Sequence, residues 1–299
     1  MNFIAAALLI GFPWASPPPP DVDRKEDVIY GRKFGTALTM DVYVPKARKN
    51  GAGVIYAVSG GWFSARQPVR PAVYDEFLRR GYVVFAVVHG SQPRFTIPEV
   101  LDDMNRAVRY IRHHAKDYGV NANRLGIAGG SAGGHLSLMQ GCAPREGNSK
   151  SKDPVEQETS RVAAVACFFP PTDFLNYGKP GVEAIGDGIL KGFKAPFDFV
   201  EFDSKSNSFE RVTDSEKRRQ ITRRISPVYH VTEKSSPALI IHGDADTLVP
   251  IQQAELIIEK LKAANVPCEL VVKPKAAHGW PGLDKDFRLL ADWFDKYLK

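Results

Sequence analysis

One serine stands in a pattern that is typical of a nucleophile. Residues 124–138 read RLGIAGGSAGGHLSL, in which an apolar strand pattern runs through Gly129-x-Ser131-x-Gly133 into a helical pattern. A turn this tight strains the serine backbone and needs glycine beside it, because neighbouring segments come close. The following helix would direct its positive N-terminal field toward the hydroxyl. We therefore predict that Ser131 is a catalytic nucleophile, the alternative being a structural glycine-rich turn.

A serine hydroxyl is a poor nucleophile at neutral pH, so the chain must supply a base and a group that orients it. Among the seven histidines, His278 lies in a loop of small residues between the last predicted strand and the last predicted helix. Asp244 and Asp246 follow another predicted strand, and either carboxylate could fix the histidine tautomer. The order serine, aspartate, histidine along the chain is that of hydrolases with this serine turn.

A tetrahedral intermediate also needs donors for its oxyanion. The backbone N–H of Ala132, directly after the serine, is one candidate. Gly60 and Gly61 follow the predicted strand 54–58 and allow the backbone to approach a reacting carbonyl. We predict an oxyanion hole from these three residues, although a plain glycine turn would leave the same pattern.

Large aromatic residues flank the proposed site in the sequence. Trp62, Phe63 and Trp280 could line a substrate pocket, but large aromatics also occur in ordinary cores. Other histidines suit supporting roles: His135 follows the serine by one helical turn, and His242 precedes the aspartate loop. His113 and His114 are adjacent on a predicted helix, so they face different directions.

The sequence predicts neither a metal nor a cofactor. The glycines around Ser131 do not satisfy Gly-x-Gly-x-x-Gly, no Gly-x-x-x-x-Gly-Lys occurs, and no ligand cluster with metal spacing is present. Three widely spaced cysteines suggest no disulfide framework. A net charge of +6 is too small, without a basic cluster, to indicate nucleic acid.

Strand-length apolar runs alternate with helical patterns, which predicts an α/β fold with a doubly wound, mostly parallel sheet. The expected strands are 38–44, 54–58, 82–88, 125–128, 162–168, 238–242 and 269–272. The expected helices are 99–118, 251–264 and 286–298. The alternation lapses at about 171–226, a segment rich in glycine, phenylalanine and arginine. We expect this segment to be a cap over the carboxyl edge of the sheet, or else a satellite core with a solvated helix face.

The amino-terminal residues differ from the rest of the chain. An apolar run at 3–12 is too short to span a bilayer and is followed by five prolines within residues 13–20. We interpret residues 1–26 as an export signal and proline-rich spacer and residues 27–299 as one domain. This predicts a secreted or periplasmic protein, the alternative being an apolar tail on a cytoplasmic one.

These motifs resemble those of α/β-hydrolases of the esterase and lipase group, related to hormone-sensitive lipase and to bacterial acetyl-xylan and feruloyl esterases. The resemblance rests on Gly-Gly-Ser-Ala-Gly-Gly-His at 129–135 and His-Gly-Asp-Ala-Asp-Thr-Leu-Val-Pro at 242–250. In that pattern the last aspartate orients the histidine, which selects Asp246. The oxyanion motif departs from the usual His-Gly-Gly-Gly-Trp, since this chain has Val58-Ser59-Gly60-Gly61-Trp62.

The resemblance implies a serine hydrolase that cleaves carboxylic esters through an acyl-enzyme, with acetyl or feruloyl esters of plant polysaccharide, or small-molecule esters, as substrates. From the charge and the short apolar run, we expect no nucleic-acid partner and no stable membrane insertion after signal removal. Two alternatives stay open. One is a serine peptidase resembling prolyl oligopeptidase, which shares the serine turn, and the other is a catalytically silent binding protein.

Overall fold

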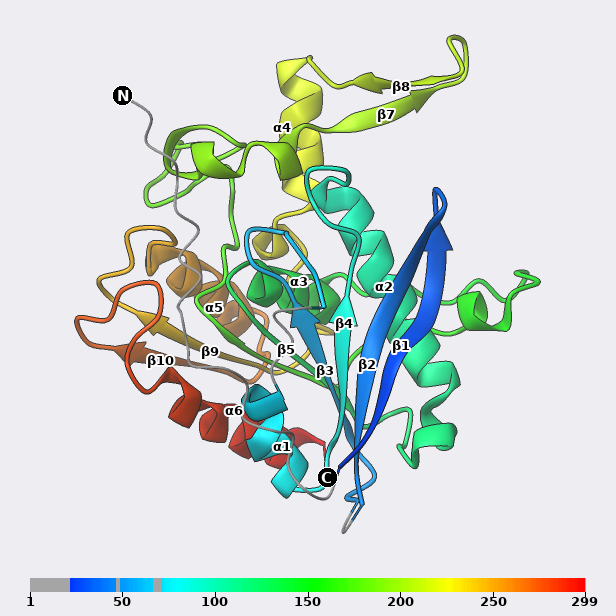
Figure 1. Cartoon of the computed structure of the whole chain (residues 1–299). Helices are drawn as coiled ribbons and strands as arrows, with labels where there is room; N and C mark the ends of the chain where they lie inside the picture. Colours follow the sequence, from blue (N-terminus) through cyan, green and yellow to red (C-terminus); the bar gives the residue numbers. More distant parts are fainter. Residues whose placement is uncertain (1–21, 47–48, 67–70, 299) are drawn as a thin grey trace.

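The computed structural model describes residues 22–46, 49–66 and 71–298. Its centre is an eight-stranded sheet in the order β1-β2-β4-β3-β5-β6-β9-β10 (Figure 1). The sheet is parallel from β4 to β10, whereas β2 is antiparallel to both of its neighbours. The strands are β1 Val22–Lys33, β2 Thr36–Pro45, β3 Gly53–Val58, β4 Val83–Val88, β5 Leu125–Gly130, β6 Ala164–Phe168, β9 Ala238–Gly243 and β10 Cys268–Lys273.

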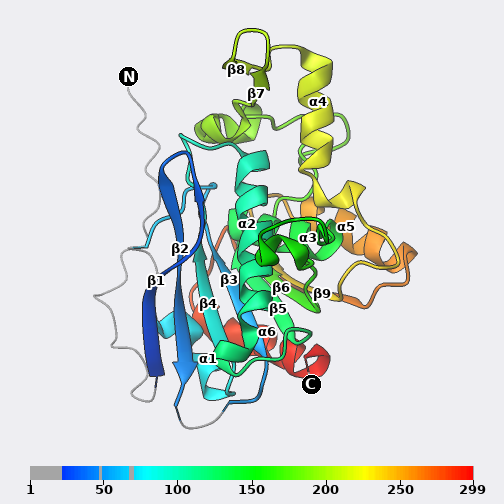
Figure 2. The same ribbon diagram turned by 90° about the vertical axis from the view of Figure 1, so that its right-hand side faces the viewer.

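Helices cover both faces of this sheet, as a doubly wound pattern requires (Figure 2). One core contains the apolar sides of α2, α3 and α5, and a second core on the other face contains those of α1 and α6. The helices are α1 Asp75–Arg79, α2 Ile97–His113, α3 Ala132–Cys142, α4 Ser215–Arg224, α5 Gln252–Ala263 and α6 Leu283–Tyr297. Short 3-10 turns join them at η1 Pro71–Tyr74, η2 Ala115–Tyr118, η3 Pro154–Gln157, η4 Gly188–Phe193, η5 Ala195–Phe197 and η6 Pro227–Tyr229.

Local chemistry explains where α2 begins. Thr96 N–H donates to Glu99 Oε2 at 2.9 Å, which closes a capping box, and Pro98 lies in the first turn, where its missing N–H costs nothing. The helix therefore begins two residues before the predicted start at Glu99. It ends at His113, and the rest of the predicted helix forms η2.

The register of the central strands brings three chain segments to one edge. Gly130 on β5 pairs with Phe168 on β6, and Phe168 in turn pairs with Ile241 on β9. Lys273 on β10 pairs with Gly243. Because these strands are parallel, the loops that follow them emerge together at the carboxyl edge, which is where open α/β sheets place their ligands.

The amino-terminal part of the domain starts earlier than predicted. β1 begins at Val22, five residues before the expected start of the domain, and pairs with β2 along its length. Most of its side chains are half-buried or exposed, and seven of its twelve residues are charged, so it lacks an apolar signature. The proposed export run at 3–12 lies outside the described residues. Within the described residues, no helix is both long and apolar enough to cross a bilayer.

The predicted insertion is a separate lobe between β6 and β9. It contains η4, η5, the small hairpin of β7 (Val200–Asp203) and β8 (Ser208–Arg211), and α4, and it stands above the sheet in Figure 1. Phe197 and Phe199 are fully buried in the main core, whereas Phe202 and Phe209 on the hairpin are each 55% exposed. The insertion thus joins the core through one part and leaves its hairpin in solvent.

Candidate active site

Ser131 occupies the turn between β5 and α3 in a strained conformation. Its φ of 54° and ψ of −121° lie in a region that side chains other than glycine rarely adopt. The strain is held by close packing, since a Cβ on Gly133 would lie 2.6 Å from the Ala57 carbonyl oxygen and one on Gly129 would lie 2.5 Å from the Gly133 backbone. The turn presents the Ser131 hydroxyl at the carboxyl edge of the sheet.

The loops after β9 and β10 bring two more side chains to this hydroxyl. His278 Nε2 lies 2.9 Å from Ser131 Oγ, and His278 Nδ1 lies 2.6 Å from Asp246 Oδ2. A carboxylate only accepts hydrogen bonds, so Nδ1 carries the proton and Nε2 is free to accept the serine proton. The ring of Phe169 packs against the imidazole with centroids 4.4 Å apart. The three predicted residues thus form one hydrogen-bonded series.

Asp246 is enclosed by donors. Its Oδ1 accepts the N–H groups of Leu248 and Val249, both at 2.9 Å, and its side chain has no exposed surface. Burial raises the pKa of the Asp246 carboxyl, but hydrogen bonds involving His242 and His278 and the Val249 N–H outweigh burial and hold the pKa below its ordinary value. The carboxyl therefore stays ionised near neutral pH.

Asp244, the other candidate from the same loop, bonds to the backbone rather than to the imidazole. It is exposed, and its Oδ1 accepts the backbone N–H of Lys275 at 2.5 Å. The motif alone leaves open which of the two carboxylates orients the histidine, and the structure identifies Asp246.

The predicted oxyanion donors divide into two groups. Gly61 and Ala132 line a small cavity with Ser131, at the loop after β3 and the first turn of α3. Gly60 departs from the prediction, because its N–H donates to the Phe63 carbonyl at 3.0 Å and closes a tight turn. That N–H is therefore occupied, and the geometry leaves Gly61 and Ala132 as the pair next to the serine.

The cavity beside Ser131 is small and mostly apolar, with a volume of about 20 Å³. Its lining residues come from five separate segments of the chain: Gly61, Trp62, Ser131, Ala132, Pro171, Tyr177, Leu190, Phe193, Leu248 and Val249. Leu190 and Phe193 belong to η4 of the insertion, and Phe193 packs so closely on Gly61 that a Cβ there would overlap its ring. The sequence predicts a phenylalanine-rich cap that includes Phe193, but nothing local to Leu190 or Phe193 indicates which loop they would meet.

The three predicted pocket aromatics lie in different surroundings. Trp62 is 2% exposed and lines the cavity, and its Nε1 donates to His135 Nδ1 at 3.2 Å. Phe63 is 51% exposed and is not among the lining residues. Trp280 also lies outside the lining; its Nε1 donates to Asp286 and its ring packs edge-on against Phe169.

Two further histidines support the site from within. His135 is fully buried, and its Nε2 lies 2.6 Å from the Ile225 carbonyl oxygen, which ties α3 to the insertion. His242 Nε2 lies 2.8 Å from the Val249 carbonyl oxygen and so closes the loop that carries Asp246. A histidine that sequence reasoning passed over, His89, lies beside the loop after β3, with its Nε2 2.8 Å from Ser59 Oγ.

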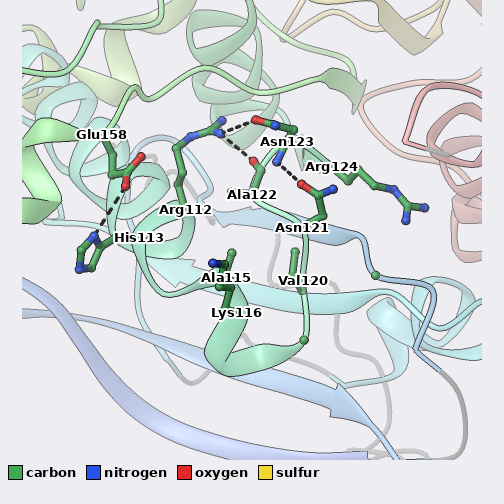
Figure 3. Close-up of a pocket in the computed structure, with 12 residues that line it drawn as sticks. Arg112, His113, Ala115, Lys116, Val120, Asn121, Ala122, Asn123, Arg124 and Glu158 are labelled. Carbon is green, nitrogen blue, oxygen red and sulfur yellow. Dashed lines mark hydrogen bonds and ion pairs between the residues drawn. The ribbon is translucent and has the colours of Figure 1, made fainter.

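A larger hollow of about 920 Å³ lies at the opposite edge of the sheet, before β3 and β5 (Figure 3). Its two arginines are already engaged, since Arg112 donates to the Ala122 carbonyl at 2.7 Å and Arg124 donates to the Asn50 carbonyl at 2.9 Å. His113 is paired with Glu158 at 3.6 Å. The lining contains no serine, threonine or cysteine, so the hollow offers no counterpart to Ser131. Within the described residues, no three His, Cys, Asp or Glu side chains gather as metal ligands.

A comparison with models of protein families shows which family the chain belongs to. The model of the family described as BD-FAE matches residues 40–261, which is more than half of the chain. The chain belongs to the BD-FAE family. The match contains Ser131 and Asp246, and it ends before His278.

Curated relatives of this BD-FAE protein carry esterase names. It is 27% identical over 250 residues to the probable carboxylic ester hydrolase LipM of Mycobacterium tuberculosis, covering 82% of this chain and 53% of LipM. It is 26% identical over 266 residues to esterase LipC of the same organism, covering 87% of this chain and 61% of LipC. The chain thus spans a little over half the length of these relatives.

Solved structures confirm the predicted α/β-hydrolase fold of this BD-FAE protein. A truncated carbohydrate esterase from gut microbiota superposes with a TM-score of 0.76 at 23% identity, covering 95% of this chain and 99% of that one. An acetyl ester-xyloside bifunctional hydrolase from Caldicellulosiruptor lactoaceticus superposes with a TM-score of 0.70 at 22% identity, covering 94% of this chain and 96% of that one. Both similarities extend over the insertion as well as the sheet.

Proposed function

We propose that the chain is a serine esterase that hydrolyses small carboxylic esters, with acetyl groups on carbohydrate as the preferred substrates. The observation that carries the proposal is the hydrogen-bonded series from Ser131 through His278 to Asp246 at the carboxyl edge of the sheet. The ester hydrolase names of the M. tuberculosis relatives support the reaction class.

The geometry supports acyl transfer in two steps. Ser131 Oγ attacks the ester carbonyl carbon while His278 Nε2 takes the hydroxyl proton, and the N–H groups of Gly61 and Ala132 stabilise the oxyanion. His278 then gives that proton to the leaving alcohol, and an acyl group remains on Ser131. A water molecule, deprotonated by the same nitrogen, attacks the acyl carbonyl carbon. His278 then returns that proton to Ser131 Oγ as the bond to the acyl group breaks and the acid leaves. Throughout, Asp246 fixes the imidazole and stabilises its charged form.

The cavity beside Ser131 supports a short acyl group. A volume of about 20 Å³ is close to the minimum that holds one water molecule, roughly 10–15 Å³ on the same measure. The methyl of an acetyl group suits such a space, whereas an aromatic feruloyl group would need η4 to move. Names such as carbohydrate esterase and acetyl ester-xyloside hydrolase among the structural neighbours agree with acetylated sugar as the carrier.

A panel of p-nitrophenyl esters tests the proposal. We expect kcat/KM to fall from acetyl to butyryl to long-chain esters, with a methyl ferulate reaction slower than that of acetate. Replacement of Ser131 by Ala should remove the activity while the circular dichroism spectrum and Tm are retained. Hydrolysis of an aminoacyl-prolyl amide with no ester hydrolysis would instead favour a peptidase, and a folded chain with neither activity would favour a binding protein.

A further inference from the structure

A second serine and histidine meet at the loop that carries Gly61. Val58 on β3 pairs with Val88 on β4, so the next residues, Ser59 and His89, leave the sheet side by side. His89 Nε2 lies 2.8 Å from Ser59 Oγ. The two side chains therefore link the loop after β3 to the loop after β4.

The surroundings of His89 decide the direction of this hydrogen bond. Its Nδ1 lies 2.6 Å from the Gly90 carbonyl oxygen, which can only accept, so Nδ1 carries the proton. Nε2 is then an acceptor, and the Ser59 hydroxyl donates to it. His89 is 3% exposed, and burial lowers its pKa to about 4, so the ring is neutral at pH 7.

Other bonds hold the same loop from both ends. Ser64 Oγ donates to the Val58 carbonyl at 2.5 Å and accepts the His89 N–H at 3.2 Å. Gln92 N–H donates to the Trp62 carbonyl at 3.2 Å. Ser59 is the link that directly precedes the two glycines, so its side chain sets the path of the backbone as it enters Gly61.

We propose that Ser59 and His89 are positioning residues, which hold the Gly61 N–H where the oxyanion of the substrate forms. The inference rests on the proposed esterase function. Neither side chain lines the cavity beside Ser131, so they act through the backbone rather than on the substrate. An oxyanion donor that is misplaced stabilises the transition state less while ground-state binding changes little.

Replacement of Ser59 by Ala tests the proposal with p-nitrophenyl acetate. We expect kcat to fall roughly 10-fold to 100-fold, less than the ~10²- to 10³-fold loss of a whole oxyanion donor, and KM to change by less than about threefold. Ser59→Thr keeps the hydroxyl and should recover most of the lost kcat. Ser59→Ala combined with His89→Leu should lose no more kcat than the worse single variant, because both substitutions remove the same Ser59–His89 hydrogen bond.

Ser236→Ala is the matched control. Ser236 is a buried serine whose Oγ donates a hydrogen bond to the Val162 carbonyl at 2.7 Å, and it lies away from the loop. We expect this variant to keep the wild-type kcat. Equal kcat losses in Ser59→Ala and Ser236→Ala would overturn the proposal, as would a Ser59→Ala variant with kcat within twofold of wild type.

Acetate ester hydrolysis by the wild-type protein distinguishes failure of this proposal from failure of the proposed esterase function. If the wild type does not hydrolyse acetate esters, the esterase function and this inference both fail. If it does, and Ser59→Ala retains kcat, only the positioning role fails. Labelling of Ser59 by a fluorophosphonate in the Ser131→Ala variant would also contradict the proposal, because Ser59 would then be a nucleophile.

Discussion

Asp246 Oδ2 lies 2.6 Å from His278 Nδ1, and the other oxygen of the same carboxyl accepts two backbone N–H groups. The carboxylate is therefore fixed before any substrate arrives, and it allows one imidazole tautomer. An amide at this position would keep the backbone contacts through its oxygen and turn its NH₂ toward Nδ1. His278 would then carry its proton on Nε2 and could not accept one from Ser131.

This relationship predicts the effect of Asp246→Asn. We expect kcat for acetate esters to fall by roughly 10³- to 10⁴-fold with the fold retained, because the wrong tautomer blocks general-base catalysis. Steady-state kinetics at pH 7.5 measures the loss. Asp244→Asn, which alters the exposed carboxylate of the same loop, should keep most of the wild-type rate. Similar losses in both variants would contradict the assignment of Asp246.

The glycines after β3 predict a contrast between neighbours. Gly61 has φ of +54° and would place a Cβ into the Phe193 ring, whereas a Cβ on Gly60 meets nothing within 4 Å. Gly61→Ala should therefore lower kcat by about 100-fold or more, since it displaces an oxyanion donor. Gly60→Ala should retain at least a third of the activity. A greater loss of kcat in Gly60→Ala than in Gly61→Ala would contradict the assignment of Gly61 as the oxyanion donor.

The wall formed by Phe193 predicts acyl selectivity. Truncation to Ala enlarges the cavity beside Ser131, so kcat/KM for butyrate relative to acetate should rise by about 10-fold or more. Phe209→Ala, which removes an exposed ring from the same insertion, provides the control and should leave this ratio unchanged. If the ratio is the same in all three proteins, Phe193 does not limit acyl size.

His135 predicts a pH dependence of stability. Burial lowers the pKa of the His135 imidazole to about 4, although the hydrogen bond to the Ile225 carbonyl acts in the opposite direction. The folded state therefore resists protonation while the unfolded state takes a proton near pH 6.5. Its contribution to the free energy of unfolding is constant above about pH 6.5 and falls by about 2 kcal/mol between pH 7 and pH 5.

Urea unfolding at both pH values, for wild type and His135→Gln, measures this contribution. The variant should be less stable at pH 7 and should lose less stability on acidification, by about 2 kcal/mol. An equal decrease in the free energy of unfolding of the two proteins would contradict this prediction, because His135 would then not cause the loss of stability between pH 7 and pH 5.

Most strands of the central sheet can be predicted from the sequence because each depends on a local apolar pattern. The seven predicted strands correspond to β2 to β6, β9 and β10. The apolar runs of the central strands are buried on both faces, whereas β10 at the edge of the sheet is partly exposed. β1 escaped prediction because an edge strand with charged residues has no apolar signature. The β7–β8 hairpin escaped for a similar reason, since its Phe202 and Phe209 lie in solvent.

The site shows the same division. Ser131, Asp246 and His278 stand in short motifs that local geometry requires, and the structure brings these side chains together. Which glycine keeps a free N–H depends on the turn between Gly60 and Phe63, which no spacing rule revealed. His89 and Phe193 contact the loop after β3 from 30 and more residues away in the chain, so only the folded arrangement identifies them.

The proposed esterase mechanism depends most directly on Ser131 being the nucleophile of an acyl transfer. Mass spectrometry after reaction with a fluorophosphonate measures this, because the probe bonds covalently to an activated serine. We predict a single adduct on the peptide that contains Ser131, with loss of ester hydrolysis in proportion to labelling and no adduct in folded Ser131→Ala. An active protein that resists the probe, or carries the adduct on another residue, would contradict the account.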